Sequence, residues 1–478
     1  MAYEQVRFEI DSEKAIQNKG LKKALVNVTN RFRSARNNAS HDVSNWEELR
    51  SAAREVKKET ISNLDKYLLM LEDSVKSKGG RVHWAKDSKD ASEIIIKIAE
   101  DSNVKSVVKS KSMATEEIEL NDKFNEAGIK VVETDLGEYI IQLAGEHPSH
   151  IIAPAIHKTK DDISRLFSDT FDIPYYDKPE DLTKFAREKL RNEFLNADMG
   201  VSGANFAVAE TGTIVVVENE GNARMTTTVP RIHVALVGIE KLIPRYEDLS
   251  LFLTVLARSA TGQKSSTYVS FITGPKRQSD IDGPEEFHLV LLDNGRSNIL
   301  ASDETRESLY CIRCGACLNN CPVYRQVGGH SYGWAYSGPI GAIINPQLLG
   351  LDKASELPFA SSLCGACHDV CPVKIDFPKV LLELRKNVVE SKSKSTRLGE
   401  AFLEKTGIKL WRFAMMNERI YKTTNKLGYY LQKPFRSGDD KLNSLPYPFS
   451  RWTEQRDFPA VAKKTFRESW ADIKQGIG

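Results

Sequence analysis

The sequence predicts an α/β domain with a mainly parallel sheet, followed by an all-helical domain. Between residues 75 and 300, short apolar runs of strand length alternate with longer segments whose apolar residues recur at helical spacing. All seven cysteines lie between residues 311 and 371, and a helix is expected after each of the two Cys-Pro pairs there. A chain of 478 residues is too long for one hydrophobic core, so several domains are expected.

Four segments are expected along the chain. The first is helical, because apolar residues recur at helical spacing opposite a face rich in lysine and glutamate. This pattern breaks at Gly79 and Gly80, where the first strand of the α/β domain follows. The expected segments are N-terminal helices at 1–74, the α/β domain at 75–300, the cysteine-bearing domain at 301–395, and C-terminal helices with an extended tail at 396–478.

Strands and helices alternate within the α/β segment, which implies a parallel sheet flanked by helices. Around residues 203–222 the pattern is instead strand, tight glycine turn and strand. The predicted strands are Arg81–Ala85, Val104–Val108, Ile129–Glu133, Ile232–Val237 and Phe287–Leu292, and two of the predicted helices are Asp90–Glu100 and Ala114–Ala127.

Two loops and one turn of the α/β segment are candidate binding or catalytic elements. Lys109–Met113 follows a predicted strand and offers ammonium and hydroxyl groups suited to an anion. Glu133–Glu138 enters a helix with acids at its positive end, which plain helix capping also explains. Glu210 precedes Thr211–Thr213 at the tight turn and is the candidate catalytic residue, although the threonines can simply satisfy the turn. The segment has no dinucleotide or Walker motif.

The first cysteine run reads Cys311-Ile-Arg-Cys314-Gly-Ala-Cys317-Leu-Asn-Asn-Cys321-Pro. It matches the bacterial iron–sulfur pattern C-x2-C-x2-C-x3-C-P, in which the fourth cysteine ligates the other of two clusters. Spacings of two residues let consecutive thiolates wrap one cluster, while the proline redirects the chain. Cys321 is therefore expected to face a second cluster.

The second run reads Cys364-Gly-Ala-Cys367-His-Asp-Val-Cys371-Pro and shares the C-x3-C-P ending. By reciprocity, its last cysteine completes the first cluster. The predicted ligands are Cys311, Cys314, Cys317 and Cys371 for the first cluster, and Cys321, Cys364 and Cys367 for the second.

The second cluster lacks one cysteine ligand, because Ser361 stands where a full motif begins with cysteine. Three alternatives follow. The centre is a [3Fe-4S] cluster, a [4Fe-4S] cluster with Ser361, His368 or another oxygen or nitrogen donor, or a [4Fe-4S] cluster with a labile iron. The first cluster is expected to be [4Fe-4S].

Other cysteine chemistry fits these runs less well. Structural zinc also uses C-x2-C pairs, but it takes four ligands and gives no reason for the shared Cys-Pro endings. Disulfides are disfavoured because seven is odd, the cysteines are close in the chain, and no secretion signal is present. A thioredoxin-like site needs one C-x-x-C pair at the start of a helix, and these two longer cysteine runs do not fit that pattern.

Charge and hydropathy exclude several classes of partner. The net charge is +2, and basic residues are scattered among acids, so nucleic acid is not expected. No apolar run approaches the roughly 20 residues that span a bilayer. The chain is expected to be cytoplasmic, where thiols stay reduced. A peripheral membrane association through partners stays open.

Taken together, these stretches resemble the lactate utilization protein B family, the iron–sulfur subunits of three-protein L-lactate oxidation systems. The family also lacks the eighth cysteine. The resemblance rests on Lys109–Met113, Glu133–Glu138, Gly203–Gly221, both cysteine runs with Ser361, and the tail from Trp452 to Pro459.

The resemblance implies more than the residues alone. The α/β region would be similar in fold to sugar isomerases and CoA transferases, and the cluster region to the helical ferredoxin domain of succinate dehydrogenase. The implied partners are a subunit with cysteine-rich repeats and a smaller subunit with another such α/β domain. The implied function is electron transfer in a complex that converts L-lactate to pyruvate, not stand-alone catalysis. The alternative is a catalytic α/β domain acting on a hydroxy-acid or acyl substrate.

Overall fold

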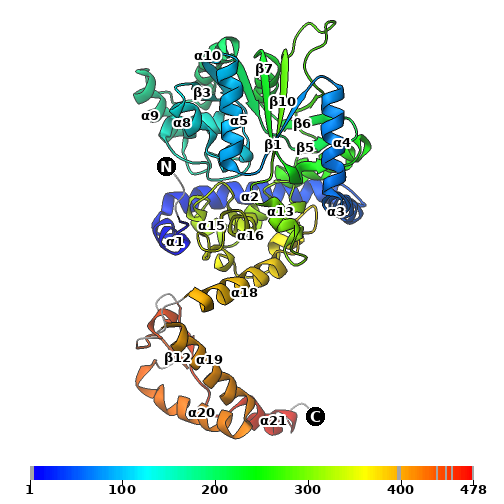
Figure 1. The fold of residues 1–478 in the computed structure, drawn as a ribbon. Coiled ribbons are helices and arrows are strands. Elements are labelled where there is room, and N and C mark those ends of the chain that lie inside the picture. Colours follow the sequence, from blue (N-terminus) through cyan, green and yellow to red (C-terminus); the bar gives the residue numbers. More distant parts are fainter. Residues whose placement is uncertain (1–4, 396–399, 438–439, 447–448, 454–455, 476–478) are drawn as a thin grey trace. The chain divides into compact units, whose positions relative to one another are not determined.

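A computed structural model describes residues 5–395, 400–437, 440–446, 449–453 and 456–475 (Figure 1). The chain forms two compact units, Met1–Val388 and Val389–Gly478. The first unit contains the N-terminal helices, the α/β region and both cysteine runs. Within the described residues, no helix is long and apolar enough to cross a bilayer.

A six-stranded, all-parallel sheet is the centre of the first unit, which confirms the predicted parallel α/β region. The strand order is β1-β10-β7-β4-β2-β3. Strand β7 is buried along its whole length, as expected for a central strand with both faces covered. The strands are β1 (Arg81–Ala85), β2 (Ser106–Lys109), β3 (Lys130–Glu133), β4 (Met199–Ser202), β7 (Ile232–Gly238) and β10 (Glu286–Leu292).

Successive strand residues face opposite sides of this sheet. On one side, Val107 and Val131 pack with side chains of α5 (Ser88–Asp101) and α7 (Leu120–Glu126). On the other side, Val108 and Val132 pack with side chains of α8 (Leu136–Ala144) and α10 (Pro179–Asn196). Helix α9 (Lys160–Phe171) packs on α8.

The predicted helix over 114–127 is wrong in one respect, because it is two helices. Helix α6 (Met113–Glu117) ends before Glu119, whose φ of 51° lies in the left-handed region. Helix α7 then starts in a new direction. The break allows Ile118, Leu120 and Phe124 all to be buried, which one straight helix would not achieve.

A second, four-stranded mixed sheet has the order β8-β5-β6-β9. The predicted strand, turn and strand at 203–222 form its hairpin, and Gly212 in the turn has a φ of 68°. A Cβ atom at Gly212 would lie 2.8 Å from the carbonyl carbon of Ser74, so only glycine fits there. The strands are β5 (Phe206–Val208), β6 (Thr213–Glu218), β8 (Leu242–Ile243) and β9 (Tyr268–Ile272), and α11 (Asn222–Thr228) and α12 (Leu249–Ala260) lie between them in sequence.

The N-terminal helices connect the α/β region to the cysteine region. Helix α2 contacts α12 of the α/β region and the short helices α14 (Ala316–Asn320) and α15 (Tyr324–Val327) of the cysteine region. In Figure 1, α2 runs between the α/β region and the helices of the cysteine region. The N-terminal helices are α1 (Phe8–Gln17), α2 (Lys19–His41), α3 (Trp46–Ser62) and α4 (Leu64–Ser77).

Residues 301–395, all of which are described, contain helices and turns and no strand. Gly315 and Gly365 occupy equivalent places in the two Cys-Gly-Ala-Cys segments, and both have positive φ angles, 75° and 81°. A short helix starts directly after each of them. The helices following Gly315 and Gly365 are α14 and α17 (Ala366–Val370), and the longer ones are α16 (Gly338–Leu349) and α18 (Phe377–Ser395).

The second unit contains helices and a small antiparallel sheet that the sequence did not predict. Part of the expected extended tail, at 447–448 and 454–455, lies outside the described residues. The elements are α19 (Glu400–Met416), α20 (Glu418–Leu431), α21 (Phe466–Gln475), β11 (Arg436–Ser437), β12 (Lys441–Leu442) and β13 (Phe458–Pro459).

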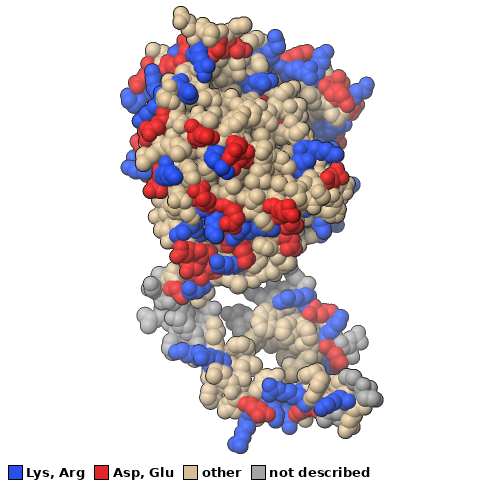
Figure 2. Space-filling view, turned by 90° about the vertical axis from the view of Figure 1, so that its right-hand side faces the viewer, with Lys and Arg blue, Asp and Glu red and all other residues tan. Residues whose placement is uncertain are grey.

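On the face of the first unit shown in Figure 2, lysine and arginine side chains are interspersed with aspartate and glutamate. This face therefore has no extended patch of a single charge.

Candidate iron–sulfur site

Four cysteines line one small cavity in the first unit. Three come from the first run, and Cys371 joins them from the second run. Cys311 is half-buried and the other three are buried. The four are Cys311, Cys314, Cys317 and Cys371, referred to below as the first cysteine set.

The remaining three cysteines form a second set, Cys321, Cys364 and Cys367. Electrostatic interactions connect Cys321 with Cys364 and Cys367 with both of the others. Cys321 and Cys367 are buried, whereas Cys364 is exposed. The second set therefore reaches the protein surface.

Both sets are costly environments for unbound thiolates. Burial, reinforced by neighbouring sulfurs, raises the pKa of Cys367 to about 12 and that of Cys371 to about 11. The same causes raise the pKa of Cys317 well above its ordinary value. Thiolates at such positions need a positive partner, which an iron centre provides.

No three cysteine sulfurs of the described residues lie within 4.8 Å of one another. All seven cysteines lie in the described part of the chain, where the only three potential ligand atoms found within 4.8 Å of one another belong to glutamates. Four thiolates on one zinc ion, each about 2.3 Å from the metal, would lie within roughly 4 Å of one another. The wider spacing and the all-sulfur donor set fit a cluster of several irons.

Backbone amides donate to sulfurs of both sets. The N–H of Arg313 lies 3.4 Å from Cys311 Sγ, that of Tyr324 lies 3.5 Å from Cys321 Sγ, and that of Ile375 lies 3.5 Å from Cys371 Sγ. Such hydrogen bonds stabilise thiolates and help to set the reduction potential of a bound cluster.

Two arginines of the N-terminal helices hold the second cysteine run, and sequence reasoning missed both. Arg36 Nη2 donates to the carbonyl of Val370 at 3.2 Å. Arg50 donates from Nε to the carbonyl of Cys371 at 3.0 Å and from Nη2 to that of His368 at 3.2 Å. Both side chains are buried. Their partners are main-chain atoms far along the chain, so no local pattern could have revealed them.

His150 connects the α/β region with the first cysteine run. Its Nδ1 accepts the N–H of Ile152 at 3.1 Å, so Nε2 carries the proton and donates to Asn319 Oδ1 at 3.2 Å. Burial lowers the pKa of His150 to about 4, so the ring is neutral at ordinary pH. Nearby, the Tyr324 hydroxyl donates to the carbonyl of Ser149 at 2.8 Å.

The two candidate donors for the missing ligand have different surroundings. Ser361 Oγ accepts the N–H of Leu363 at 3.1 Å. His368 Nδ1 donates a hydrogen bond to the carbonyl of Ile375 at 2.9 Å, so Nε2 is the ring nitrogen available to a metal. A neutral imidazole in this tautomer can ligate a metal through Nε2.

A cavity of about 250 Å³ lies at the carboxyl ends of the parallel strands. It is lined by Ser110–Ser112 after β2, Gly203–Asn205 after β4, and Lys241 beyond β7. Arg313 lines this cavity and also the cavity of the first cysteine set. The predicted anion-binding loop 109–113 therefore lies next to the first cysteine run.

Buried ion pairs hold Arg313 at the carboxyl edge of the parallel sheet. Glu240 accepts hydrogen bonds from Arg296 Nε at 2.5 Å and from Arg313 Nη2 at 3.0 Å. Although burial opposes its ionisation, these two cations lower the pKa of Glu240 to about 2. Arg296 also pairs with Glu117 at 2.8 Å. The guanidinium of Arg313 lies over the ring of Tyr336, 4.5 Å from its centre.

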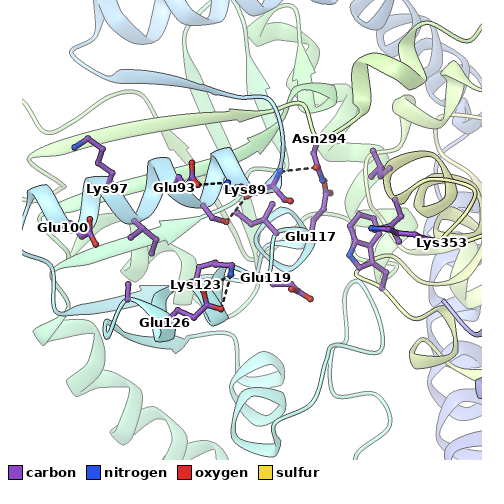
Figure 3. Close-up of a pocket in the computed structure, with 18 residues that line it drawn as sticks. Lys89, Glu93, Lys97, Glu100, Glu117, Glu119, Lys123, Glu126, Asn294 and Lys353 are labelled. Carbon is purple, nitrogen blue, oxygen red and sulfur yellow. Dashed lines mark hydrogen bonds and ion pairs between the residues drawn. The ribbon is translucent and has the colours of Figure 1, made fainter. Parts of the chain in front are cut away.

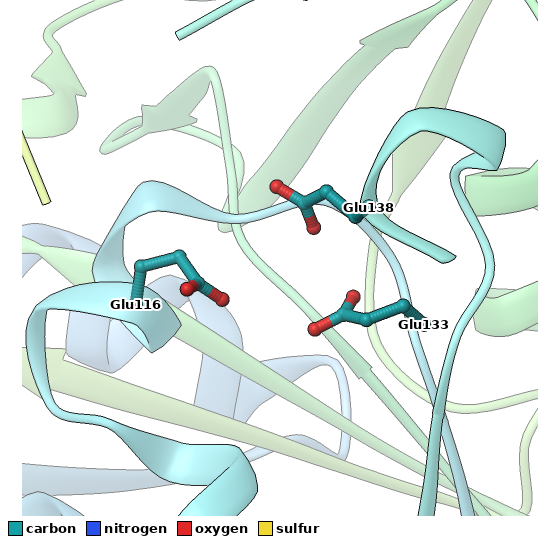
Figure 4. Close-up of side chains that lie close together, drawn as sticks. All are labelled: Glu116, Glu133 and Glu138. Carbon is teal, nitrogen blue, oxygen red and sulfur yellow. The ribbon is translucent and has the colours of Figure 1, made fainter. Parts of the chain in front are cut away.

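The loop 133–138 forms a separate buried group with Lys109. Glu116, Glu133 and Glu138 approach one another (Figure 4), and Lys109 Nζ pairs with Glu133 at 2.6 Å and Glu116 at 3.1 Å. Both carboxyl oxygens of Glu138 are buried without a partner in the described structure. Burial and the charge of Glu133 raise the pKa of Glu138, which favours its protonated form.

Glu210 lies apart from both the cysteine sets and the cavity. It is exposed at the turn after β5, and its Oε2 accepts the N–H of Tyr246 at 2.9 Å. Glu210 does not line the cavity at the strand ends. The structure thus does not bring it together with the other candidate residues.

A larger open cavity of about 960 Å³ lies beside α5 and α7 (Figure 3). Several of its charged side chains pair with each other, including Lys89 with Glu93 and Lys123 with Glu126. These pairs are typical of a solvated surface.

Three family models match the chain: "LUD domain" over residues 68–292, "4Fe-4S dicluster domain" over 307–375, and "Lactate utilisation protein B, C-terminal" over 383–475. A protein of Bacillus subtilis (strain 168) named "Lactate utilization protein B" is 44% identical over 458 residues, covering 96% of this chain and 94% of its own. A protein of the same name from Geobacillus sp. (strain WCH70) is 43% identical over 465 residues, covering 97% and 96%. A crystal structure of a DUF162 family protein from Deinococcus radiodurans covers 48% of this chain and 98% of its own, with 14% identity and a TM-score of 0.28.

Proposed function

Because the chain belongs to the lactate utilization protein B family, we propose that it is the iron–sulfur electron-transfer subunit of a complex that oxidises L-lactate to pyruvate. The family name supports a part in lactate utilisation, and the dicluster match supports iron–sulfur clusters. One observation carries the electron-transfer role. Four cysteines, three of them buried and Cys311 half-buried, line one cavity, and of the other three Cys364 is exposed at the surface.

The first cysteine set would hold a [4Fe-4S] cluster. The second set would hold either a [4Fe-4S] cluster with a non-cysteine fourth site, for which Ser361 and His368 are candidates, or a [3Fe-4S] cluster. Bound clusters would supply one-electron transfer. The chain itself shields the first set from water, fixes the loop of Cys371 through Arg36 and Arg50, and exposes Cys364 toward a partner.

The proposal also includes the partners, the fold of the α/β region, the domain bounds and the location that the sequence predicts. The partners would be a subunit with cysteine-rich repeats and a smaller subunit with a second α/β domain of this kind. The α/β region would share the fold of sugar isomerases and CoA transferases, and the four segments bounded at 74, 300 and 395 would be its domains. The complex would be cytoplasmic, with its partners providing any contact with a membrane.

A second candidate function is catalysis by the α/β region on a hydroxy-acid or acyl substrate. The cavity at the strand ends favours it, because this cavity adjoins the first cysteine set through Arg313. A catalytic role of Glu210 stays a prediction, since its carboxylate binds the Tyr246 amide outside that cavity.

Anaerobic purification with metal analysis tests the proposal. We expect about seven or eight irons per chain, and reduction of the iron–sulfur absorbance by L-lactate when the partner subunits are present. Zinc in place of iron, or lactate oxidation by the complex that persists when all seven cysteines are replaced by serine, would overturn it.

A further inference from the structure

We propose that the cavity at the strand ends binds a small organic carboxylate of the 2-hydroxy-acid or 2-oxo-acid class, next to the first cysteine set. The presence of an anion site follows from the side chains that line the cavity. The class of acid rests on the proposed function.

The location of this cavity is the first argument. Ligands of open α/β sheets usually bind at the carboxyl ends of the strands, and the loops after β2, β4 and β7 line it. Arg313 and Ile151 line both this cavity and that of the first cysteine set. A ligand held by Arg313 would therefore lie beside the residues that hold the first cluster.

Unpartnered donors in the cavity wall are the second argument. Arg313 is only 7% exposed, yet its Nε and Nη1 have no hydrogen-bond partner in the described structure. Lys241, which is half-buried, also lines the cavity, and its ammonium group makes no hydrogen bond or ion pair with a described residue. Ser110 is 2% exposed, and its Oγ is also buried without a partner. Buried donors of this kind are costly unless a ligand or water binds them.

The acidic side chains that line the cavity, by contrast, already have hydrogen-bond or ion-pair partners. Glu240 binds Arg296 and Arg313, and Asp135 accepts from the N–H of Glu138 and pairs with Lys111. Glu218 accepts the N–H groups of Ala223 and Arg224, and Glu220 accepts the N–H of Leu136. The spare hydrogen-bonding capacity therefore comes from cations and a hydroxyl, which selects an anion.

Size and shape favour a carboxylate. Pockets for drug-sized molecules occupy about 300–1,000 Å³, and this cavity of about 250 Å³ suits a smaller ligand. The ring of Tyr336 and the carboxylate of Glu240 fix the plane of the Arg313 guanidinium. The free N–H groups of Nε and Nη1 lie on different sides of the guanidinium, so each can donate one charge-assisted hydrogen bond to an oxygen of a bound anion. The Ser110 hydroxyl can bond an oxygen on the neighbouring carbon.

A rival explanation is that Arg313 and Lys241 only offset the negative charge of the nearby thiolates. Both side chains interact electrostatically with Cys311. The two explanations differ in one measurable respect, because only the proposed site binds a small organic carboxylate from solution.

The test uses the full-length, iron-loaded protein under anaerobic conditions. Isothermal titration calorimetry is carried out with L-lactate, pyruvate and inorganic phosphate, separately. We expect one site per chain for at least one of the two acids, and weaker or no binding of phosphate. Lys241→Gln and Ser110→Ala should each weaken acid binding, Lys241→Gln by at least about tenfold, the loss expected for one charge-assisted hydrogen bond. Lys97→Gln is the matched control, because Lys97 is exposed, lies outside the cavity and pairs with Asp101.

Iron content and electron paramagnetic resonance spectra are recorded for every variant. The proposal is overturned if neither acid binds to protein with intact clusters, if phosphate binds more tightly than both acids, or if Lys241→Gln shifts the midpoint potential of the first cluster without changing acid binding. The first of these outcomes leaves the electron-transfer role standing. Acid binding by a protein that assembles no cluster would support the site and overturn the proposed function instead.

Discussion

Arg313 Nη2 and Glu240 Oε1 lie 3.0 Å apart, and this buried contact joins the first cysteine run to the carboxyl edge of the parallel sheet. Arg313 stands between Cys311 and Cys314 in the sequence, while Glu240 follows β7. One carboxylate thus positions a residue that belongs both to the cluster-binding loop and to the cavity wall.

Glu240→Gln should lower the free energy of unfolding by about 3 kcal/mol, because it leaves Arg296 and Arg313 buried with one counter-charge fewer. Denaturant unfolding of the protein, with the same iron content in both samples, measures the loss. Glu247→Gln is the control, since Glu247 pairs with Arg245 at the surface, and its loss should be below about 1 kcal/mol. Equal effects of the two substitutions would contradict a structural role for the buried carboxylate.

Cys371→Ser should alter the spectrum of the same cluster as Cys314→Ser, although the two cysteines belong to different runs, because both line one cavity. Cys321→Ser should instead alter the signal affected by Cys364→Ser. Electron paramagnetic resonance of anaerobic samples separates the two signals. The opposite grouping would show that the ligand sets are wrong.

Arg50→Met should speed the loss of iron to a chelator, because it removes two hydrogen bonds that hold the carbonyls of Cys371 and His368. Each such bond from a charged group contributes about 1.5–3 kcal/mol. The absorbance of the clusters, followed over time with excess chelator, gives the rate. Arg33→Met, at an exposed position of the neighbouring helix α2, should leave the rate unchanged.

Acidification should destabilise the fold through His233, a fully buried residue of β7 that bonds Ser202 Oγ at 2.7 Å. Burial, with a smaller effect of His288, lowers the pKa of His233 to about 3 from 6.5. The fold thus holds the neutral ring, and its contribution is complete above pH 6.5 and is lost as the pH falls from 6.5 toward 3. The free energy of unfolding should decrease by up to about 1.4 kcal/mol per pH unit from this residue.

Comparison with His233→Gln checks this pH dependence. Between pH 7 and pH 5, the free energy of unfolding should decrease more steeply with falling pH in the unsubstituted protein than in the variant. Parallel curves would mean that another group is responsible. His41→Gln, at an exposed position, should keep the steep curve.

Local patterns predicted the parts of this molecule that depend on local chemistry. Five of the six strands of the parallel sheet follow from short apolar runs, whereas β4 (Met199–Ser202) was not predicted. The two cysteine runs were recognised from their ligand spacing. The break at Glu119 was missed, because helical periodicity continues through it and only the burial of Leu120 and Phe124 requires the new direction.

Contacts between distant segments could not be predicted from such patterns. Arg36 and Arg50 bind main-chain carbonyls of the second cysteine run, and every residue offers a carbonyl, so no partner side chain marks the pairing. Arg313 was visible only as a spacer residue between two cysteines. Its role in the cavity wall depends on how the sheet and the cysteine region pack together.

The exposure of Cys364 determines which cysteine set oxidants reach first. Six of the cysteines are buried or half-buried, but this one faces solvent, so dioxygen and peroxide can reach the second set directly while the first set is covered by protein. The isolated subunit should therefore suffer oxidative damage at the second set first, and a docked neighbour that covers Cys364 would act as its shield in air.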